Sequence, residues 1–273
     1  MIKTICKRCS ILFFTLIAMF YIWGGGFGCL PKNNNSTNHI FSHRGYPLGT
    51  VENSSEAFKI SFNHGIKAIE LDIRMTKDNV PVIFHDASCK RLLGLSGNIT
   101  DYSWEEIKTE NLLYNGEITT NTIIKLSDFL NNVALADVLY LDIKEASIEL
   151  GDQLIELLLK KNNYKTVMVA DENLPFLIYL RSQTNKIPLI LEGFNKGKEW
   201  IYFLIPKRFK PDYLASFLSE VDQNHINFLK ENELLSRKIV YGVKSKNFEQ
   251  AKAFGIQNMV VDINEDILEK LQK

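Results

Sequence analysis

The chain has 273 residues with 32 basic and 32 acidic side chains, and 45% of its residues are hydrophobic. This balanced charge argues against nucleic acid as the main partner, because proteins that bind duplexes usually carry a basic face. The composition also excludes a disordered chain and a disulfide scaffold, and the roughly 235 residues that follow position 38 suit one large α/β domain.

The first 30 residues have the pattern of a targeting or anchoring segment. Basic residues among the first eight precede a run from Ser10 to Leu30 that carries no charge. The basic flank predicts a cytoplasmic N-terminus, so we expect a membrane-anchored protein whose folded domain faces the extracytoplasmic side. Three interpretations stay open: a lipoprotein signal with a lipidated Cys29, an uncleaved membrane-spanning helix, and simple secretion. Residues 31–38 are polar and predict a tether.

Beyond residue 38, short apolar runs alternate with helical patterns. The runs that predict strands are His39–His43, Ala68–Ile73, Val138–Ile143, Thr166–Ala170, Pro188–Leu191, Asp212–Phe217, Lys238–Val243 and Asn258–Asp262. The patterns that predict helices are Ser54–Asn63, Ser127–Ala136, Leu150–Lys161, Leu174–Ser182, Glu199–Ile205, His225–Glu233 and Phe248–Phe254. Strands joined by crossover helices in this number indicate a (β/α)8 TIM barrel, which would occupy residues 39–273.

One further apolar run, Pro81–His85, does not fit this alternation. It follows Ile73 too closely for a parallel crossover, so we expect it to return as a hairpin through turn residues 77–79. The segment from about residue 76 to residue 121 is too long for an ordinary barrel loop, and it contains a short helix start at Ser103. Because insertions of this length usually cap an active site, we expect this one above a barrel rim, after the second strand.

Ionisable groups gather at the ends of three apolar runs. They are His43 with Arg44, Glu70 with Asp72, and His85. Two histidines can exchange protons near neutral pH. Carboxylates at positions i and i+2 of a strand point to the same face and can together hold a hard divalent cation. The set predicts metal-assisted transfer at an anionic centre such as a phosphodiester.

The same residues belong to a longer pattern that resembles the glycerophosphodiester phosphodiesterase family. The pattern comprises His43-Arg44-Gly45, Glu52-Asn53-Ser54, Glu70-Leu71-Asp72-Ile73 and Pro81-Val82-Ile83-Phe84-His85-Asp86. Weaker matches to the family are Leu141-Asp142-Ile143-Lys144 and Val260-Val261-Asp262. The resemblance implies a small-molecule partner, an sn-glycero-3-phosphodiester. It implies hydrolysis of that diester to an alcohol and sn-glycerol 3-phosphate.

The residues and the resemblance together give the central side chains their expected roles. His43 and His85 are the expected acid–base pair: one removes the proton from the attacking oxygen, and the other protonates the leaving alkoxide. Glu70 and Asp72 are expected to bind a divalent metal ion, and oxygen-only ligation favours Mg²⁺ or Ca²⁺ over Zn²⁺.

A basic and an acidic residue complete the predicted site. Arg44 offers a planar fork for phosphate oxygens, or alternatively an ion pair with Glu70 or Glu52. Lys144 follows Asp142 by two positions, so both are expected at the barrel mouth, with Lys144 binding substrate. The family usually has Glu where this chain has Asp142. The expected third metal ligand is therefore shorter by about 1.5 Å.

Two other functions remain possible on the sequence alone. One is a phosphodiesterase of the lysophospholipase D type, and the other is a non-catalytic lipoprotein that binds phosphodiesters. The intact His43 and His85 argue against the second, whereas the shorter Asp142 favours it. The seventh strand ends in Tyr241-Gly242-Val243-Lys244, which departs from the family, so the alcohol in the substrate stays open.

Two further features of the sequence lie outside the predicted site. The aromatic and basic stretch Trp200–Phe209 is predicted either to dock on a membrane or to form a barrel helix with its loop. His225 belongs to no cluster like those around His43 and His85, and it is predicted to lie on the surface.

Overall fold

The structure is a computed structural model. It describes residues 2–28, 30, 38–133, 135–160 and 166–272, and for residues 2–11 it describes the backbone alone. Cys29 and residues 31–37 of the predicted tether lie outside the described residues.

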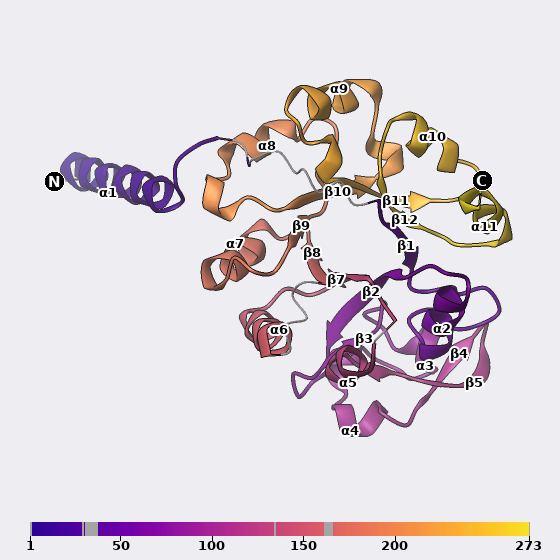
Figure 1. Cartoon of the computed structure of the whole chain (residues 1–273). Coiled ribbons are helices and arrows are strands. Elements are labelled where there is room, and N and C mark those ends of the chain that lie inside the picture. The colour runs from indigo at the N-terminus through magenta and orange to yellow at the C-terminus, as the bar shows by residue number, and fades with distance from the viewer. Residues whose placement is uncertain (1, 29, 31–37, 134, 161–165, 273) are drawn as a thin grey trace.

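A closed barrel of parallel strands forms the centre of the molecule (Figure 1). In the described part of the chain, eight strands pair in parallel around the ring, and β1 pairs with both β2 and β12, which closes it. The barrel strands are β1 (Ile40–His43), β2 (Ala68–Met75), β7 (Val138–Ile143), β8 (Val167–Asp171), β9 (Leu189–Leu191), β10 (Tyr213–Phe217), β11 (Lys238–Val243) and β12 (Asn258–Val261). The predicted (β/α)8 TIM barrel is confirmed.

Helices follow the barrel strands and cover the outside of the ring (Figure 1). They are α2 (Ser55–Asn63), α5 (Leu126–Asn132), α6 (Ile148–Lys160), α7 (Leu174–Gln183), α8 (Glu199–Leu204), α9 (Gln223–Glu231), α10 (Phe248–Ala253) and α11 (Glu265–Leu271). Short 3-10 turns precede or follow β10 and β11, at η3 (Lys207–Phe209), η4 (Leu218–Glu220) and η5 (Leu235–Arg237). The predicted elements have the right type, with ends shifted by a few residues.

The alternation of side chains along β2 separates the core from the mouth of the barrel. Leu71 and Ile73 point outward and are fully buried in the layer between strands and helices. Ala68 points inward, to the apolar cluster that fills the barrel. Glu70 and Asp72 follow on the inward side, because successive residues of a strand alternate between faces. The polar residues of β2 therefore lie above the filled interior, at the C-terminal end of the barrel.

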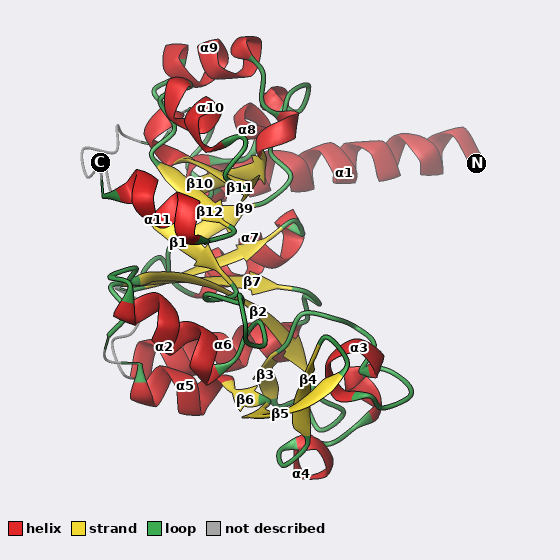
Figure 2. Ribbon diagram, turned by 90° about the vertical axis from the view of Figure 1, so that its right-hand side faces the viewer, coloured by secondary structure: helices red, strands yellow, loops and turns green. Residues whose placement is uncertain are grey.

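The predicted hairpin after the second barrel strand is also confirmed. β3 (Pro81–Ile83) pairs antiparallel with the end of β2, with Ile83 opposite Ile73. The rest of the insertion lies beside α2 and α5 (Figure 2) and consists of α3 (Lys90–Leu93), η1 (Ile99–Asp101), α4 (Trp104–Ile107), β4 (Asn111–Tyr114), β5 (Glu117–Thr122) and β6 (Ile124–Lys125). It has a small apolar core of its own, which buries Cys89. The insertion is thus a packed unit.

His225 is not on the surface, so that prediction is wrong. Its side chain is fully buried on α9, and its Nδ1 lies 2.8 Å from a carboxylate oxygen of Glu199 on α8. A buried imidazole needs such a partner, and a partner 26 positions away leaves no signal in local spacing.

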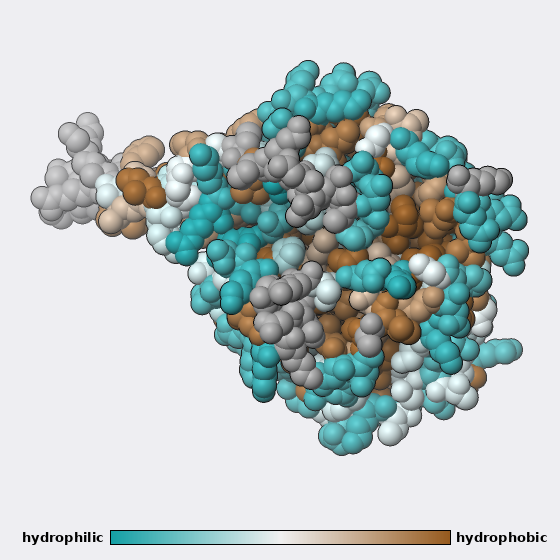
Figure 3. Space-filling view, in the orientation of Figure 1, coloured by the Kyte–Doolittle hydropathy of each residue, from teal (hydrophilic) through white to brown (hydrophobic). Residues whose placement is uncertain are grey.

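A separate helix, α1 (Ile2–Trp23), projects from the barrel next to α8 (Figures 1 and 2). Its end rests on η3, where the rings of Phe20 and Phe209 stack at 5.2 Å. The described side chains of α1 are mostly exposed and apolar (Figure 3). Phe13 and Phe14 are among them. Among the helices that the structure describes, none is long and apolar enough to cross a bilayer.

Candidate active site

Carboxylates from two neighbouring strands lie together at the barrel mouth. Glu70 and Asp72 come from β2, and Asp142 comes from β7, where the parallel register sets it opposite Asp72. One carboxylate oxygen from each lies within 4.8 Å of the others. Such a group offers oxygen donors, the type that Mg²⁺ and Ca²⁺ prefer. The structure thus brings together the three residues that the sequence predicts as metal ligands.

Two cations partly neutralise these carboxylates. Lys144 Nζ lies 2.7 Å from Asp72 Oδ1 and 2.5 Å from Asp142 Oδ2, and Arg44 Nε lies 3.1 Å from Asp72 Oδ2. Burial raises the pKa of Asp72, but Lys144 and Arg44 outweigh it and hold that pKa below its ordinary value. Burial and the charges of Asp72 and Asp142 raise the pKa of Glu70 well above its ordinary value. A bound divalent cation would relieve this repulsion.

The turn after β1 places Arg44 beside the carboxylates. Arg44 has a φ of 58° and Gly45 a φ of 82°, both in the left-handed region. A Cβ on Gly45 would lie 2.8 Å from the carbonyl carbon of Ala57, so only glycine fits against α2 here. The turn lets the Arg44 N–H donate to Glu70 Oε2 at 3.0 Å while the guanidinium reaches Asp72. This accounts for the His-Arg-Gly sequence.

His43 is held by a carboxylate from the last barrel strand. Its Nδ1 lies 2.6 Å from Oδ1 of Asp262, which directly follows β12, and its Nε2 lies 4.0 Å from Glu70 Oε2. The hydrogen bond from His43 lowers the pKa of Asp262. With Nδ1 engaged, Nε2 is the ring atom free to exchange a proton at the carboxylate group. Sequence reasoning assigned no role to Asp262, although its place at the end of a predicted strand was visible.

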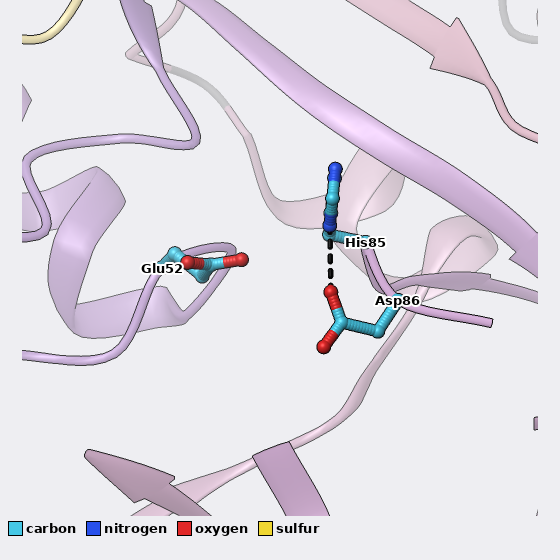
Figure 4. A group of neighbouring side chains, drawn as sticks. All are labelled: Glu52, His85 and Asp86. Atoms are coloured by element: carbon cyan, nitrogen blue, oxygen red, sulfur yellow. Dashed lines mark hydrogen bonds and ion pairs between the residues drawn. The ribbon is translucent and has the colours of Figure 1, made fainter. Parts of the chain in front are cut away.

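His85 is held in the same way by its neighbour in the chain (Figure 4). It lies in the loop after β3, and its Nδ1 is 2.7 Å from Asp86 Oδ1. The loop is fixed by Arg74, whose Nε donates to the His85 carbonyl oxygen at 2.7 Å. A hydrogen bond from Arg91 of the insertion lowers the pKa of Asp86 to about 2. His85 therefore also keeps Nε2 for proton transfer.

Glu52, His85 and Asp86 also lie close enough together to hold a metal ion, but a guanidinium already joins the two carboxylates. Arg91 donates from Nε to Asp86 Oδ2 and from Nη2 to Glu52 Oε1, both at 2.7 Å. Glu52 also accepts from Arg44 Nη1 at 2.9 Å. Glu52 thus forms one of the two ion pairs considered for Arg44. Sequence reasoning missed Arg91, because its partner Glu52 lies 39 positions away.

Most of the predicted site residues line one cavity of about 420 Å³. Its lining includes His43, Arg44, Glu70, His85, Asp142 and Lys144, and Asp72 lies buried beneath it. Further aromatic and charged residues complete the wall, at Tyr140, Glu192, Phe217, Tyr241, Lys244 and Asp262. The predicted convergence at one rim is present, and the chemical role of each residue remains a prediction.

The lining of this cavity includes a carboxyl group that sequence reasoning missed. Glu192 directly follows β9 and accepts a hydrogen bond from the Tyr140 hydroxyl. Burial and, next, the charge of Asp142 raise the pKa of Glu192 to about 8. Its position after the predicted strand Pro188–Leu191 was the available signal, but it lacks the i, i+2 companion that marked Glu70 and Asp72.

Fold and site together define a barrel enzyme with two histidines beside an oxygen-rich carboxylate cluster. The chain belongs to the glycerophosphoryl diester phosphodiesterase family, whose model matches residues 43–266.

Individual relatives are similar over shorter segments. A glycerophosphodiester phosphodiesterase of Bacillus altitudinis is 29% identical over 113 residues, which is 37% of this chain and 46% of that protein. A lysophospholipase D of Rattus norvegicus is 38% identical over 76 residues, 28% of this chain and 24% of that protein. The chain thus spans less than half the length of these curated relatives in the matched segments.

A solved structure shares the fold over nearly its full length. It is an Oleispira antarctica phosphodiesterase in complex with the product sn-glycerol-3-phosphate, with a TM-score of 0.74 and 17% identity. The match covers 86% of this chain and 97% of that one. At this identity, the likeness supports the barrel fold.

Proposed function

We propose that this protein hydrolyses glycerophosphodiesters to an alcohol and sn-glycerol 3-phosphate. Membership of the family supports the substrate class. The observation that carries the proposal is the pair His43 and His85, each held at Nδ1 by its own carboxylate beside one carboxylate cluster. Hydrolysis of a phosphodiester needs one proton removed from the attacking oxygen and one delivered to the leaving oxygen, and this pair supplies both sites.

In the proposed reaction, His43 Nε2 takes the proton from the attacking hydroxyl or water. Asp262 holds the ring in place and stabilises the imidazolium that forms. His85 Nε2 gives a proton to the leaving alkoxide, and Asp86 holds its ring. Arg44 and Lys144 are proposed to bind phosphate oxygens with donors that now face Asp72 and Asp142.

The carboxylate cluster fits a divalent metal ion. Glu70, Asp72 and Asp142 would hold Mg²⁺ or Ca²⁺, since all three offer oxygen and their repulsion is only partly balanced by Arg44 and Lys144. Bound there, the ion would neutralise negative charge that develops on the phosphoryl group.

Hydrolysis assays with three substrates test the proposed activity. We expect purified protein with Mg²⁺ or Ca²⁺ to release glycerol 3-phosphate from glycerophosphocholine and glycerophosphoglycerol. His43→Ala and His85→Ala should each lose activity by about 10²-fold or more, with an unchanged circular dichroism spectrum. Hydrolysis of lysophosphatidylcholine alone would indicate the lysophospholipase D reaction, and binding without hydrolysis would indicate a non-catalytic protein.

We further propose that the protein is attached to a membrane through its N-terminal segment and faces the extracytoplasmic side. The basic flank and the uncharged run Ser10–Leu30 support this, as do the exposed apolar side chains of α1. Mass spectrometry of the mature N-terminus separates the anchoring modes. A lipidated Cys29 as first residue supports a lipoprotein, and a retained Met1 supports an uncleaved helix. Recovery of the wild-type protein as a soluble cytoplasmic species would contradict both.

A further inference from the structure

Three large apolar side chains are exposed on α8, next to the end of α1. Trp200 is 60% exposed, Leu204 50% and Phe203 39%. They occupy positions i, i+3 and i+4 of this six-residue helix and therefore share one face, which we call the α8 patch. Single exposed apolar residues are common on protein surfaces, but a group of them on one face indicates a contact surface.

Exposed basic side chains flank the α8 patch on both sides along the chain. Lys196 and Lys198 precede the helix, and Lys207 and Arg208 follow it on η3. The acidic residue at the start of α8 is already paired with the buried His225. Aromatic rings next to lysine and arginine are typical of proteins at the surface of a bilayer, because rings lie among the headgroups and basic side chains attract anionic lipids.

The end of α1 is bound to the same part of the barrel (Figures 1 and 2). The rings of Phe20 and Trp23 contact the ring of Phe209, with 5.2 and 4.8 Å between ring centroids. The Tyr21 hydroxyl donates to the carbonyl oxygen of Leu204, a residue of the α8 patch, at 2.6 Å. These contacts fix the base of α1 beside the patch.

The chain that follows α1 also contacts this part of the barrel. The Arg208 N–H donates to the carbonyl oxygen of Gly24 at 2.9 Å. The Leu30 N–H donates to the hydroxyl of Tyr202, on α8, at 3.4 Å. Leu30 directly follows Cys29 in the sequence, so a lipid on Cys29 would be attached within one residue of this contact. Both proposed anchors, a membrane-spanning α1 and a lipidated Cys29, therefore bring the bilayer to α8 and η3.

We propose that the α8 patch and η3 form a membrane-contact face, which holds the barrel against the headgroups of a bilayer that contains anionic lipid. This inference rests on the proposed membrane attachment, and it adds which side of the barrel meets the lipid. Trp200 inserts its ring among the headgroups, and Lys207 and Arg208 bind lipid phosphates beside it.

Quenching of tryptophan emission by brominated lipids tests this face in the full-length protein. The chain has three tryptophans, Trp23, Trp104 and Trp200. The protein is bound to vesicles of phosphatidylcholine and phosphatidylglycerol with or without bromine on the acyl chains, and the quenched fraction of the emission is measured. Trp200→Phe should lower that fraction by about a quarter or more, because it removes an emitter in contact with lipid.

The matched control is Trp104→Phe on α4, which lies on the opposite side of the barrel from α8 (Figures 1 and 2). This substitution should raise the quenched fraction, because it removes an emitter that lies away from the lipid. The two variants thus have effects of opposite sign, and the signs hold whether or not Trp23 is removed with a cleaved leader. An equal or higher quenched fraction in Trp200→Phe would overturn the membrane-contact face.

Charge reversal on η3 gives a second test of the same face. Lys207→Glu should lower the quenched fraction on these vesicles, because the new carboxylate is repelled by anionic headgroups. Lys108→Glu, on α4, should leave it unchanged. Equal effects of the two reversals would contradict the role of η3.

Two other results would assign the patch differently or remove it. If the wild-type protein forms dimers without vesicles and Trp200→Ser abolishes them, the patch binds a second copy of this chain and the proposal is wrong. If the wild-type protein does not bind the vesicles at all, the proposed membrane attachment fails and this inference fails with it. Glycerophosphodiester hydrolysis, assayed in detergent, should be unchanged in Trp200→Phe, so the proposed activity is tested separately.

Discussion

Asp72 is the residue on which the charges of the candidate site converge. It is fully buried, and its two oxygens contact Lys144 Nζ at 2.7 Å and Arg44 Nε at 3.1 Å. The Asn53 side chain also donates to Oδ2 at 2.7 Å. A carboxylate buried among so many donors stays ionised, which a metal ligand requires. Asn53 itself has a φ of 56°, so the loop after β1 adopts a left-handed turn that brings it to Asp72.

The two histidines should respond differently to the leaving group. His85→Ala should slow substrates with an alkoxide leaving group by about 10²-fold or more, and slow a nitrophenyl diester less, because nitrophenolate leaves without a proton. His43→Ala should slow both to a similar degree, because attack on either needs the base. The measurement is kcat/KM for glycerophosphocholine and for a glycerol 3-phosphate nitrophenyl ester. The reverse pattern would exchange the two roles.

The shorter carboxylate at position 142 gives a second residue-scale prediction. Asp142→Ala should raise the metal concentration for half-maximal activity by about tenfold or more, because it removes a ligand oxygen. Asp142→Glu should keep metal binding, since its carboxylate reaches further toward the cluster. Titration of activity with Mg²⁺ and Ca²⁺ measures both. Unchanged metal affinity and rate in both variants would remove Asp142 from the metal site.

The elements of the barrel were predictable because each strand is a short buried run and its polar end is visible. His43, Glu70 and Asp72 could be placed at the mouth on this basis alone. Contacts between side chains of different helices, strands and loops could not be predicted. Arg91 comes from a short helix of the insertion and meets Glu52, which lies in another loop. Glu192 accepts a hydrogen bond from the hydroxyl of Tyr140, which lies two barrel strands away.

A buried lysine between barrel and helices makes stability depend on pH. Burial lowers the pKa of Lys238, at the start of β11, to about 7, from an ordinary value of 10.5. Between these values the unfolded chain binds a proton at Lys238 that the folded protein does not. The free energy of unfolding therefore increases as pH rises from about 7 to 10.5, because of this group. The same contribution is lost as pH falls through this range.

Replacement of this lysine by an apolar residue should remove that dependence. We expect urea unfolding of the wild-type protein to show a free energy that increases from pH 7 to pH 10 relative to Lys238→Met, by an amount on the order of a few kcal/mol. Hydrogen bonds from Lys238 Nζ to Ser216 Oγ and the Phe194 carbonyl, at 2.6 and 2.7 Å, favour the charged form and reduce the effect. Parallel pH profiles for the two proteins would contradict the assignment.

At the scale of the whole molecule, three parts have separate tasks. The barrel supplies the carboxylates and His43, the insertion supplies His85 with Asp86 and Arg91, and α1 projects away from both (Figure 1). The insertion could be expected from the long gap between predicted elements. Its contribution of Arg91 could not, because it depends on how the packed insertion sits against the loop after β1.

The most direct test of the account is phosphorus NMR of glycerophosphoglycerol incubated with the purified protein. With Mg²⁺ or Ca²⁺ present, we expect the diester signal to be replaced by that of sn-glycerol 3-phosphate, and excess chelator should stop the conversion until metal is restored. An unchanged diester signal in the presence of either metal would contradict the proposed hydrolysis, and full conversion in excess chelator would contradict the metal site at Glu70, Asp72 and Asp142.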